Sequence, residues 1–352
     1  TGFIGSWLTQ WLCDLGANVI GFSLKPPTNP SLFEDINLEK KLIHIIGNVN
    51  DQSKLQKTLQ EHSPEFIFHL AAQPLVKTSY DQPVETIQTN VIGTTNLLES
   101  IKKTPSVKVC IVVTSDKCYE NKEINYAYKE TDALGGYDPY SASKAAAELV
   151  TSSYRNSFFN PNNFAEHCVS LSTARIGNVI GGGDWAKDRL VPDIVRSLST
   201  NHEIHIRNPT AVRPWQHVLE AISGLFCLSK KMHDEPISFG QPWNFGPLLD
   251  NENLTVSQLN SQIISEWGSG NYSNISEDEP HEANLLMLDS SKAIDKLNWY
   301  PVYSVKEAIS KTVTWYKEYF TNNDQVEKLT QNQISEYVEQ AKTINLRWTT
   351  NV

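Results

Sequence analysis

Two short segments carry side chains suited to acid–base chemistry. Tyr140 and Lys144 are four residues apart, so in a helix they lie one turn apart on the same face. A nearby ammonium group favours the phenolate, which would make Tyr140 usable as a base near neutral pH. The run Thr114-Ser115-Asp116-Lys117 places a hydroxyl, a carboxylic acid and an amine at consecutive positions after an apolar stretch. Together these groups would serve a reaction with more than one proton transfer.

The elements that must position these groups alternate between strands and helices. Asp138 and Pro139 are suited to be the N-cap and first residue of the helix that carries Tyr140 and Lys144. Before it, the pattern predicts helices over residues 4–15, 52–61 and 84–103 and strands over 18–24, 65–70, 108–114 and 168–174. This alternation predicts an α/β protein with a Rossmann-type, doubly wound parallel sheet covered on both faces.

The second half of the chain is less regular, with more loops and short strands such as residues 243–245. We expect three parts: a dinucleotide-binding domain over residues 1–175, a smaller and partly interleaved C-terminal substrate lobe over 176–320, and an extension over 321–352. The extension is polar and partly helical over residues 324–342. We expect it to be an oligomer contact or a loosely docked segment.

Composition excludes several classes of function. The chain has 352 residues with 30 basic and 40 acidic side chains, a formal net charge of −10, which argues against a nucleic-acid partner. Its five cysteines are widely spaced without a CxxC pair, so we expect no metal site and reduced thiols in the cytoplasm. No apolar stretch approaches the ~18 residues of a membrane span, and no signal peptide is visible.

The first residues suggest a dinucleotide site. Thr1-Gly2-Phe3-Ile4-Gly5 opens into a helix, where glycines three apart let the backbone approach a pyrophosphate. We expect the preceding strand and first glycine of such a fingerprint to be missing. Ser23 stands where an acidic residue usually binds the adenosine ribose. Lys25 could tolerate a 2′-phosphate or simply be solvated, so the choice between NAD and NADP stays open.

Two later segments add to this site. His69-Leu70-Ala71-Ala72-Gln73 follows a strand, and its small residues leave room for a flat ring or a ribose. We expect His69 itself to be a core histidine, and Asn90 to tie neighbouring loops together. The glycine-rich run 177–185 could turn tightly around a ligand or be a linker. Arg207 and Arg213 could clamp a diphosphate or form surface ion pairs.

Taken in order, these motifs resemble the extended short-chain dehydrogenase/reductase family over about residues 1–320. Within it, the likeness is greatest to the bacterial CDP-glucose 4,6-dehydratase branch of deoxysugar biosynthesis. The resemblance rests on residues 114–121, 134–141, 177–185 and 188–193. Lys117 is the most discriminating position, because the related dTDP-glucose and GDP-mannose dehydratases carry a glutamate there.

The resemblance implies an internal redox cycle on CDP-glucose with NAD as cofactor. Tyr140, polarised by Lys144, would take the proton of the sugar 4-hydroxyl, and Ser115 would hydrogen-bond the same oxygen. Asp116 would protonate the departing 6-hydroxyl, and Lys117 would be the base at C5. A lysine accepts a proton only when it is neutral, so a charged Lys117 could only stabilise the enolate. The product would be CDP-4-dehydro-6-deoxyglucose.

The resemblance also implies binding residues and an assembly. Contacts to the cofactor would come from Gly2, Phe3, Ile4, Gly5, Ser23, Asn48, Val49, Leu70, Ala71, Ala72, Thr89, Tyr140 and Lys144. Contacts to the substrate would come from Gln73, Asn178, Arg189, Arg207, Arg213 and His281. The protein would be a homodimer or homotetramer joined through its long helices, with no nucleic-acid or membrane partner and no metal.

Three other functions remain open at this point. A nucleotide-sugar 4-epimerase needs the Tyr140/Lys144 pair but has no use for an acid and a base at Asp116 and Lys117. Another nucleotide-sugar 4,6-dehydratase, acting on dTDP-glucose or GDP-mannose, would share the fold and the acid. A non-catalytic cofactor-sensing protein could lose all of these side chains, and their joint presence argues against it.

Overall fold

The centre of the molecule is a parallel sheet. The computed structural model describes residues 1–249, 253–275 and 283–349. Four strands pair in the order β10-β6-β4-β3, with bounds β3 Phe66–His69, β4 Val109–Val113, β6 Ser170–Ile176 and β10 Pro242–Phe245. β1 (Ile20–Ser23) and β2 (Ile43–Ile46) form a separate parallel pair. The expected parallel α/β architecture is confirmed.

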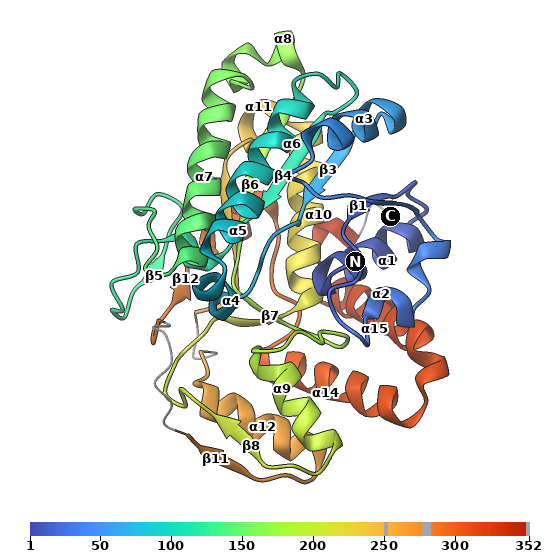
Figure 1. The fold of residues 1–352 in the computed structure, drawn as a ribbon, viewed down its shortest axis with the longest axis vertical. Coiled ribbons are helices and arrows are strands. Elements are labelled where there is room, and N and C mark those ends of the chain that lie inside the picture. Colours follow the sequence, from blue (N-terminus) through green and yellow to red (C-terminus); the bar gives the residue numbers. More distant parts are fainter. Residues whose placement is uncertain (250–252, 276–282, 350–352) are drawn as a thin grey trace.

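Alternate side chains of the central strands enter different apolar clusters. In β4, Cys110 and Val112 pack with α3 (Gln52–His62) and α6 (Gly93–Ile101). Val109 and Ile111 pack instead with α10 (Val218–Asp234). Because successive side chains of a strand point to opposite faces, the run of apolar residues in β4 is buried on both sides. Figure 1 shows α6 and α7 (Pro139–Ser157) on one side of the sheet and α10 on the other.

The helix expected over residues 84–103 is interrupted. It is divided into α5 (Pro83–Ile87), a π-helical turn over Gln88–Ile92, and α6. Asn90 lies in the π turn, and its side chain bonds both backbone groups of Gln73 and the hydroxyl of Ser143. Such turns widen a helix by one residue and often occur beside functional sites. Asn90 does tie neighbouring segments, as expected.

The second half of the chain contributes both to the sheet and to a group of elements below it. α10 and β10 return to the sheet, where β10 pairs with β6. Below the sheet in Figure 1 lie α9, α12, β8 and β11, with bounds Leu190–Ser199, Val256–Trp267, Ile204–Ile206 and Tyr272–Asn274. Between the two groups, β7 (Asn178–Ile180) pairs with β9 (Trp215–His217).

The C-terminal helices are packed into the main core. α14 (Val305–Thr321) and α15 (Val326–Thr343) bury Trp315 and Tyr337 completely. Tyr337 also donates a hydrogen bond of 2.7 Å to Glu220 of α10. The expectation of a loosely docked extension is therefore wrong, because α15 carries an apolar face that completes the largest buried cluster.

Short elements connect these parts. The helices are α2 Leu32–Asp35, α4 Val76–Asp81, α8 Phe164–His167, α11 Pro236–Phe239 and α13 Ser291–Leu297, and the short strands are β5 Ala127–Tyr128 and β12 Met287–Leu288. Turns of 3-10 helix cover Leu38–Lys40, Asp116–Cys118, Pro161–Asn163, Asn323–Gln325 and Arg347–Thr349. Within the described ranges, no helix is both long and apolar enough to cross a membrane.

Candidate active site

A large cleft lies at the carboxyl ends of the strands. Its volume is about 1860 Å³, whereas pockets for one small ligand are usually about 300–1,000 Å³. The cleft has room for two ligands side by side, although part of its volume extends between β1 and β3. Its wall includes all five residues expected to be catalytic: Ser115, Asp116, Lys117, Tyr140 and Lys144. Ligands of open α/β sheets bind at this edge.

The start of α7 fixes the position of Tyr140. The side chain of Asp138 caps the helix by accepting from the backbone N–H of Ser141 at 2.9 Å and from its hydroxyl at 2.6 Å. The backbone N–H of Tyr140 donates to Ser79 of α4 at 3.1 Å. One turn later, the ammonium of Lys144 donates to the carbonyl of Val113, at the end of β4, at 3.3 Å. The pair is thereby held against the strand that leads to Ser115.

Burial dominates the electrostatics of this pair. Loss of water raises the pKa of Tyr140 to about 12, although a hydrogen bond with Ser115 opposes the shift. Burial lowers the pKa of Lys144 to about 8, opposed by Cys118 and Glu148. In the protein alone, burial thus opposes the phenolate of Tyr140, and its use as a base near neutral pH stays a prediction. The Lys144 ammonium lies 6.0 Å from the ring centre of Tyr140.

Ser115, Asp116 and Lys117 form a compact set in the turn after β4. The Ser115 hydroxyl donates to Oδ1 of Asp116 at 2.8 Å. The Lys117 ammonium reaches the same oxygen at 3.4 Å and Oδ1 of Asn178 at 3.2 Å. Asp116 is buried, and its Oδ2 has no hydrogen-bond partner. Because an unpaired buried carboxylate oxygen is costly, Oδ2 is suited to a hydroxyl group of a ligand.

The N-terminus of α1 (Phe3–Asp14) suits a dinucleotide. Gly2 is the N-cap of this helix and has no side chain to satisfy the free N–H groups. At Gly2 and Gly5, a methyl group would meet no atom within 4 Å, so both glycines border open space in the cleft. A pyrophosphate there would accept from backbone N–H groups and interact with the positive end of the helix dipole.

The other expected cofactor residues also line the cleft: Phe3, Ile4, Ser23, Asn48, Val49, Leu70, Ala71, Ala72 and Thr89. Ser23 ends β1, and its hydroxyl bonds His44 and the carbonyl of Leu24. Asn48 uses its side-chain oxygen to accept from the backbone N–H of Asn50, which keeps that loop in a tight turn. The donors and small residues therefore fit an extended dinucleotide across the sheet edge.

Four expected substrate residues face the cleft from the second half of the chain. Asn178, Arg189, Arg207 and Arg213 all line it. Arg189 forms an ion pair of 3.0 Å with the buried Asp184, and that carboxylate holds the pKa of Arg189 above its usual value, against the opposing effect of burial. Arg213 is buried and donates to the carbonyl of Val212 at 3.0 Å.

Two expected substrate residues are not brought to the site. The side chain of Gln73 is used within its own loop, where it bonds the backbone of Leu75 and the hydroxyl of Thr86. Gln73 is not among the residues that line the cleft, and its contact with the substrate stays a prediction. His281 lies outside the described residues. His69 is buried against Thr94 with its pKa lowered to about 3 by burial, which confirms it as a neutral core histidine.

The glycine-rich run 177–185 is packed rather than free. A methyl group on Gly182 would lie 2.0 Å from ring carbons of Trp315, and the Gly182 carbonyl accepts from the indole N–H of Trp7 at 2.9 Å. Gly183 has φ of +78°, a conformation that glycine adopts readily. These glycines let the chain pass close to α14 on its way from β7 to Arg189.

The sequence reasoning missed a buried ion pair behind this site. Glu148 of α7 and Arg175 of β6 contact each other at 2.8 Å, and both side chains are almost fully buried. One signal was available, since Glu148 follows Lys144 by four residues and shares its helix face. Its partner is 27 residues away in the chain, so only the fold shows the pairing.

A parallel α/β sheet with a Tyr/Lys helix beside a glycine-bordered helix N-terminus defines an extended short-chain dehydrogenase/reductase. The chain belongs to the GDP-mannose 4,6 dehydratase family, whose sequence profile matches residues 1–312.

Relatives of known activity cover nearly the whole chain. It is 47% identical over 339 residues to the CDP-glucose 4,6-dehydratase of Salmonella typhimurium, covering 96% of this chain and 94% of that protein. It is 25% identical over 332 residues to a dTDP-glucose 4,6-dehydratase of Xanthomonas campestris, covering 90% of each.

Solved structures share the fold. A dTDP-glucose 4,6-dehydratase of Streptomyces venezuelae with bound NAD superposes with a TM-score of 0.77 at 22% identity, covering 93% of this chain and 97% of that one. The UDP-glucose 4-epimerase of Thermotoga maritima gives 0.76 at 23% identity, covering 90% of this chain and 96% of that one. The fold therefore serves both dehydratases and epimerases, and the site must distinguish them.

Proposed function

We propose that this protein is an NAD-dependent CDP-glucose 4,6-dehydratase that forms CDP-4-dehydro-6-deoxyglucose and water. The proposal is supported by the 47% identity to the Salmonella enzyme over nearly the full length of both chains. The observation that carries it in the site is the unpaired Oδ2 of the buried Asp116, next to Ser115 and Lys117. An epimerase would have no need for this acid.

Each side chain has a step that its position suits. Tyr140 takes the proton of the sugar 4-hydroxyl, while Ser115, hydrogen-bonded to Tyr140, holds the same oxygen. The resulting 4-keto group makes the C5 proton acidic. Asp116 gives a proton to the departing 6-hydroxyl, and Lys117 either accepts the C5 proton when neutral or stabilises the enolate when charged. NAD⁺ would supply the hydride chemistry by accepting from C4 and returning to C6.

Binding would use both halves of the chain. The diphosphate of the substrate would meet the arginines at the lower edge of the cleft, Arg189, Arg207 and Arg213, because guanidinium groups bind phosphate oxygens in a bidentate way. Asn178 would orient the sugar and hold Lys117, whose ammonium it contacts at 3.2 Å.

The decisive experiment incubates the purified protein with NAD⁺ and, in separate reactions, CDP-glucose, dTDP-glucose, UDP-glucose and GDP-mannose. Mass spectrometry of the products should show loss of one water from CDP-glucose. Loss of water only from another nucleotide sugar would move the assignment to that substrate. An unchanged mass with inverted C4 would indicate an epimerase. Tight NAD binding without turnover of any sugar would indicate a cofactor sensor.

We also infer a homodimer formed through α5 and α7. Their outer surfaces expose Val84, Ile87 and Ile92 from the interrupted helix and Leu149 from α7, and α5 contacts α7 directly. Exposed apolar side chains on neighbouring helices are suited to a second copy of the chain. Sedimentation should show a dimer that Leu149→Glu converts toward monomer; a wild-type monomer would contradict this assembly, and higher mass would indicate a tetramer.

The compartment is the last part of the proposal. All five cysteines are free thiols, and such proteins suit a reducing environment. We therefore propose that the protein acts in the cytoplasm, which fractionation of the source cells would test.

A further inference from the structure

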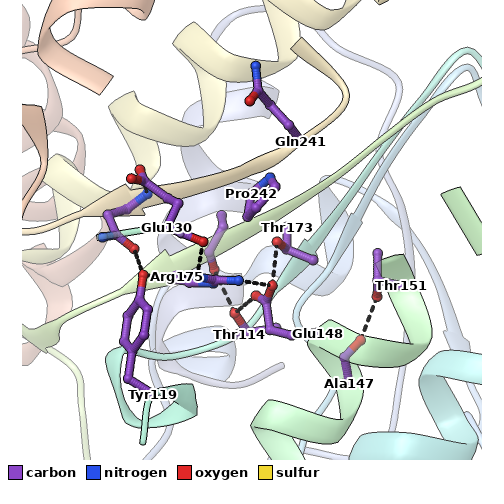
Figure 2. Close-up of polar contacts among 12 residues, drawn as sticks. Thr114, Tyr119, Glu130, Ala147, Glu148, Thr151, Thr173, Arg175, Gln241 and Pro242 are labelled. Atoms are coloured by element: carbon purple, nitrogen blue, oxygen red, sulfur yellow. Dashed lines mark hydrogen bonds and ion pairs between the residues drawn. The ribbon is translucent and has the colours of Figure 1, made fainter. Parts of the chain in front are cut away.

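A buried carboxylate behind the catalytic helix joins three elements. Glu148 of α7 accepts hydrogen bonds from Thr114 at 2.5 Å, Thr173 at 2.9 Å and Arg175 at 2.8 Å. Figure 2 shows these three donors converging on the carboxylate, with Thr114 just after β4 and Thr173 and Arg175 in β6. Both oxygens of Glu148 are therefore in use, and an ionised carboxylate, which only accepts, matches three donors.

Stability alone is a weak explanation for this pair. Taking two charges out of water costs free energy, so well-packed apolar side chains are often as stabilising as a buried ion pair. Glu148 and Arg175 are both less than 5% exposed, and Arg155 of α7 is a further buried cation that interacts with Glu148. We therefore expect a role of this cluster beyond holding the sheet to the helix.

The position of Glu148 relative to the active site suggests such a role. Glu148 follows Lys144 by four residues and Tyr140 by eight, so all three lie on one face of α7. Its partner Thr114 directly follows β4 and precedes Ser115 and Asp116. One carboxylate thus connects the helix that carries the Tyr/Lys pair to the turn that carries the acid.

Arg175 extends the connection to the other end of that turn. Its guanidinium donates to the hydroxyl of Tyr119 at 2.9 Å and to the carbonyl of Glu130 at 3.1 Å. Tyr119 in turn donates to Asn244 of β10 at 2.7 Å. Residues 114–119 are therefore held at their first residue by Glu148 and at their last by Arg175.

Glu148 is also the anion behind Lys144. The groups that face Lys144 are His69 from β3, Cys118 from the turn after β4, and Tyr140 and Glu148 from its own helix. His69 is neutral, because burial lowers its pKa to about 3. Burial raises the pKa of the Cys118 thiol well above its usual value, and that of Tyr140 to about 12. Glu148, whose carboxylate accepts from three donors, is thus the negative charge of this set.

We propose that Glu148 is a positioning residue for the proposed dehydratase. It keeps Lys144 charged, and it holds the helix of Lys144 in place against the turn that carries Ser115 and Asp116. Lys144 can then stabilise negative charge on the Tyr140 oxygen during proton transfer. The inference rests on the proposed function for its catalytic consequence but not for the charge state of Lys144.

The main test replaces Glu148 by Gln, which keeps the size of the side chain but removes its charge. The midpoint of Lys144 titration should fall by roughly one pH unit, the scale on which a nearby charge acts. It can be followed by NMR of protein with ¹³C-labelled lysine, with the Lys144 signal assigned by its loss in Lys144→Met. On CDP-glucose, the alkaline limit of kcat should move to lower pH by the same amount, with KM changing little.

Two further variants control for folding and for charge. Because Glu148→Gln leaves Arg175 buried without its partner, the double variant Glu148→Gln/Arg175→Met removes both charges and should show the same titration shift. Glu99→Gln is the matched control: Glu99 of α6 accepts from Tyr154 of α7 at 2.6 Å, at the far end of the helix from Lys144. It should leave both the titration and the kcat profile in place.

The outcomes separate this inference from the proposed function. If folded Glu148→Gln or the folded double variant titrates at Lys144 like the wild type, the positioning role is wrong. If wild-type protein releases no water from any sugar, the proposed function is wrong, while the NMR titration still tests the link between Glu148 and Lys144. A shift of equal size in Glu99→Gln would also contradict a specific role for Glu148.

Discussion

Burial and neighbouring polar groups have opposite effects on the pKa values of Tyr140 and Lys144, the pair with which the sequence analysis began. In the protein without ligands, burial raises the pKa of Tyr140 to about 12 and lowers that of Lys144 to about 8. Catalysis near neutral pH therefore requires more positive charge near the Tyr140 oxygen than the protein alone supplies. The positively charged nicotinamide ring of bound NAD⁺ would supply such a charge, so the pKa of Tyr140 would depend on whether the cofactor is bound.

Tyr140→Phe tests the base. Removal of the hydroxyl should reduce turnover of CDP-glucose by about 100- to 10,000-fold, the usual contribution of a general base. NAD affinity should change little, because the aromatic ring remains in place in the wall of the cleft. Steady-state rates and NAD titration by calorimetry measure the two effects. Turnover within a few-fold of wild type would remove Tyr140 from the mechanism.

Asp116→Asn tests the acid. The amide can fill the place of the carboxylate and still accept from Ser115, but it cannot protonate the departing 6-hydroxyl. Oxidation at C4 should continue while elimination slows by about 100-fold or more. Reduced nicotinamide should therefore build up on the enzyme and be visible by its absorbance in stopped flow. Unchanged turnover with no such build-up would place the acid elsewhere.

Prediction from sequence worked best where neighbours in the chain make the site. The runs at 114–117 and 140–144 supply five residues that the fold brings to one cleft. It gave less where a side chain has partners that the chain order hides. Gln73 was expected to contact the substrate, and in the structure its side-chain amide is bonded to Leu75 and Thr86. Glu148 went unnoticed because its charge partner, Arg175, lies on another element.

At the scale of elements, helix α1 serves two purposes, one at its N-terminal turn and one along its buried face. Its N-terminal turn borders the cleft with Gly2 and Gly5, while Trp7 and Trp11 are buried in the main core. The strands expected over residues 18–24, 65–70, 108–114 and 168–174 match β1, β3, β4 and β6 to within a few residues because their apolar periods are clear. The strand β2 and the short helices α2 and α4 were not predicted. The π turn at Gln88–Ile92 was not, since it depends on the bonds that Asn90 makes with Gln73 and Ser143.

Two glycine substitutions test this division of roles. Gly5→Ala adds a methyl group where no atom lies within 4 Å, so the free energy of unfolding should stay the same or rise by up to ~1 kcal/mol. NAD should bind more weakly, because the methyl group occupies the cleft. Gly182→Ala places the methyl group 2.0 Å from the ring of Trp315 and should cost about 1–3 kcal/mol or more.

Urea unfolding without cofactor and NAD titration of folded protein distinguish the two effects. If Gly5→Ala binds NAD like the wild type, the helix N-terminus is not the pyrophosphate site. If Gly182→Ala unfolds at the wild-type urea concentration, the glycine run is not held against α14 as described.

At the scale of the whole molecule, the C-terminal helix closes the core through one buried carboxylate. Glu220 of α10 accepts from the backbone N–H groups of Val302 and Tyr303 and from the hydroxyl of Tyr337 on α15. The sequence indicated a helix near residues 324–342, but not that it would be buried. Its few apolar residues, such as Ile334 and Tyr337, match a surface that α1, α10 and α14 create only after folding.

Glu220 should make the stability of the protein depend on pH. Burial raises its pKa from 4.5 to about 7, although the hydrogen bonds from Tyr303, Tyr337 and Val302 oppose the shift. A raised pKa means that the folded state holds the proton more tightly than the unfolded state does. The contribution of Glu220 is therefore fully present below pH about 4.5 and is lost as pH rises through about 7.

Glu220→Gln removes this dependence, because an amide stays neutral at every pH. Between pH 5 and pH 8.5, the free energy of unfolding of wild type should fall relative to that of the variant by about 2–3 kcal/mol, at 1.36 kcal/mol for each pKa unit. Urea unfolding of both proteins at the two pH values measures this difference. Glu336→Gln, which removes an exposed carboxylate paired with Lys311 next to Tyr337, should behave like wild type. Parallel curves for wild type and Glu220→Gln would mean that Glu220 does not exchange its proton on unfolding.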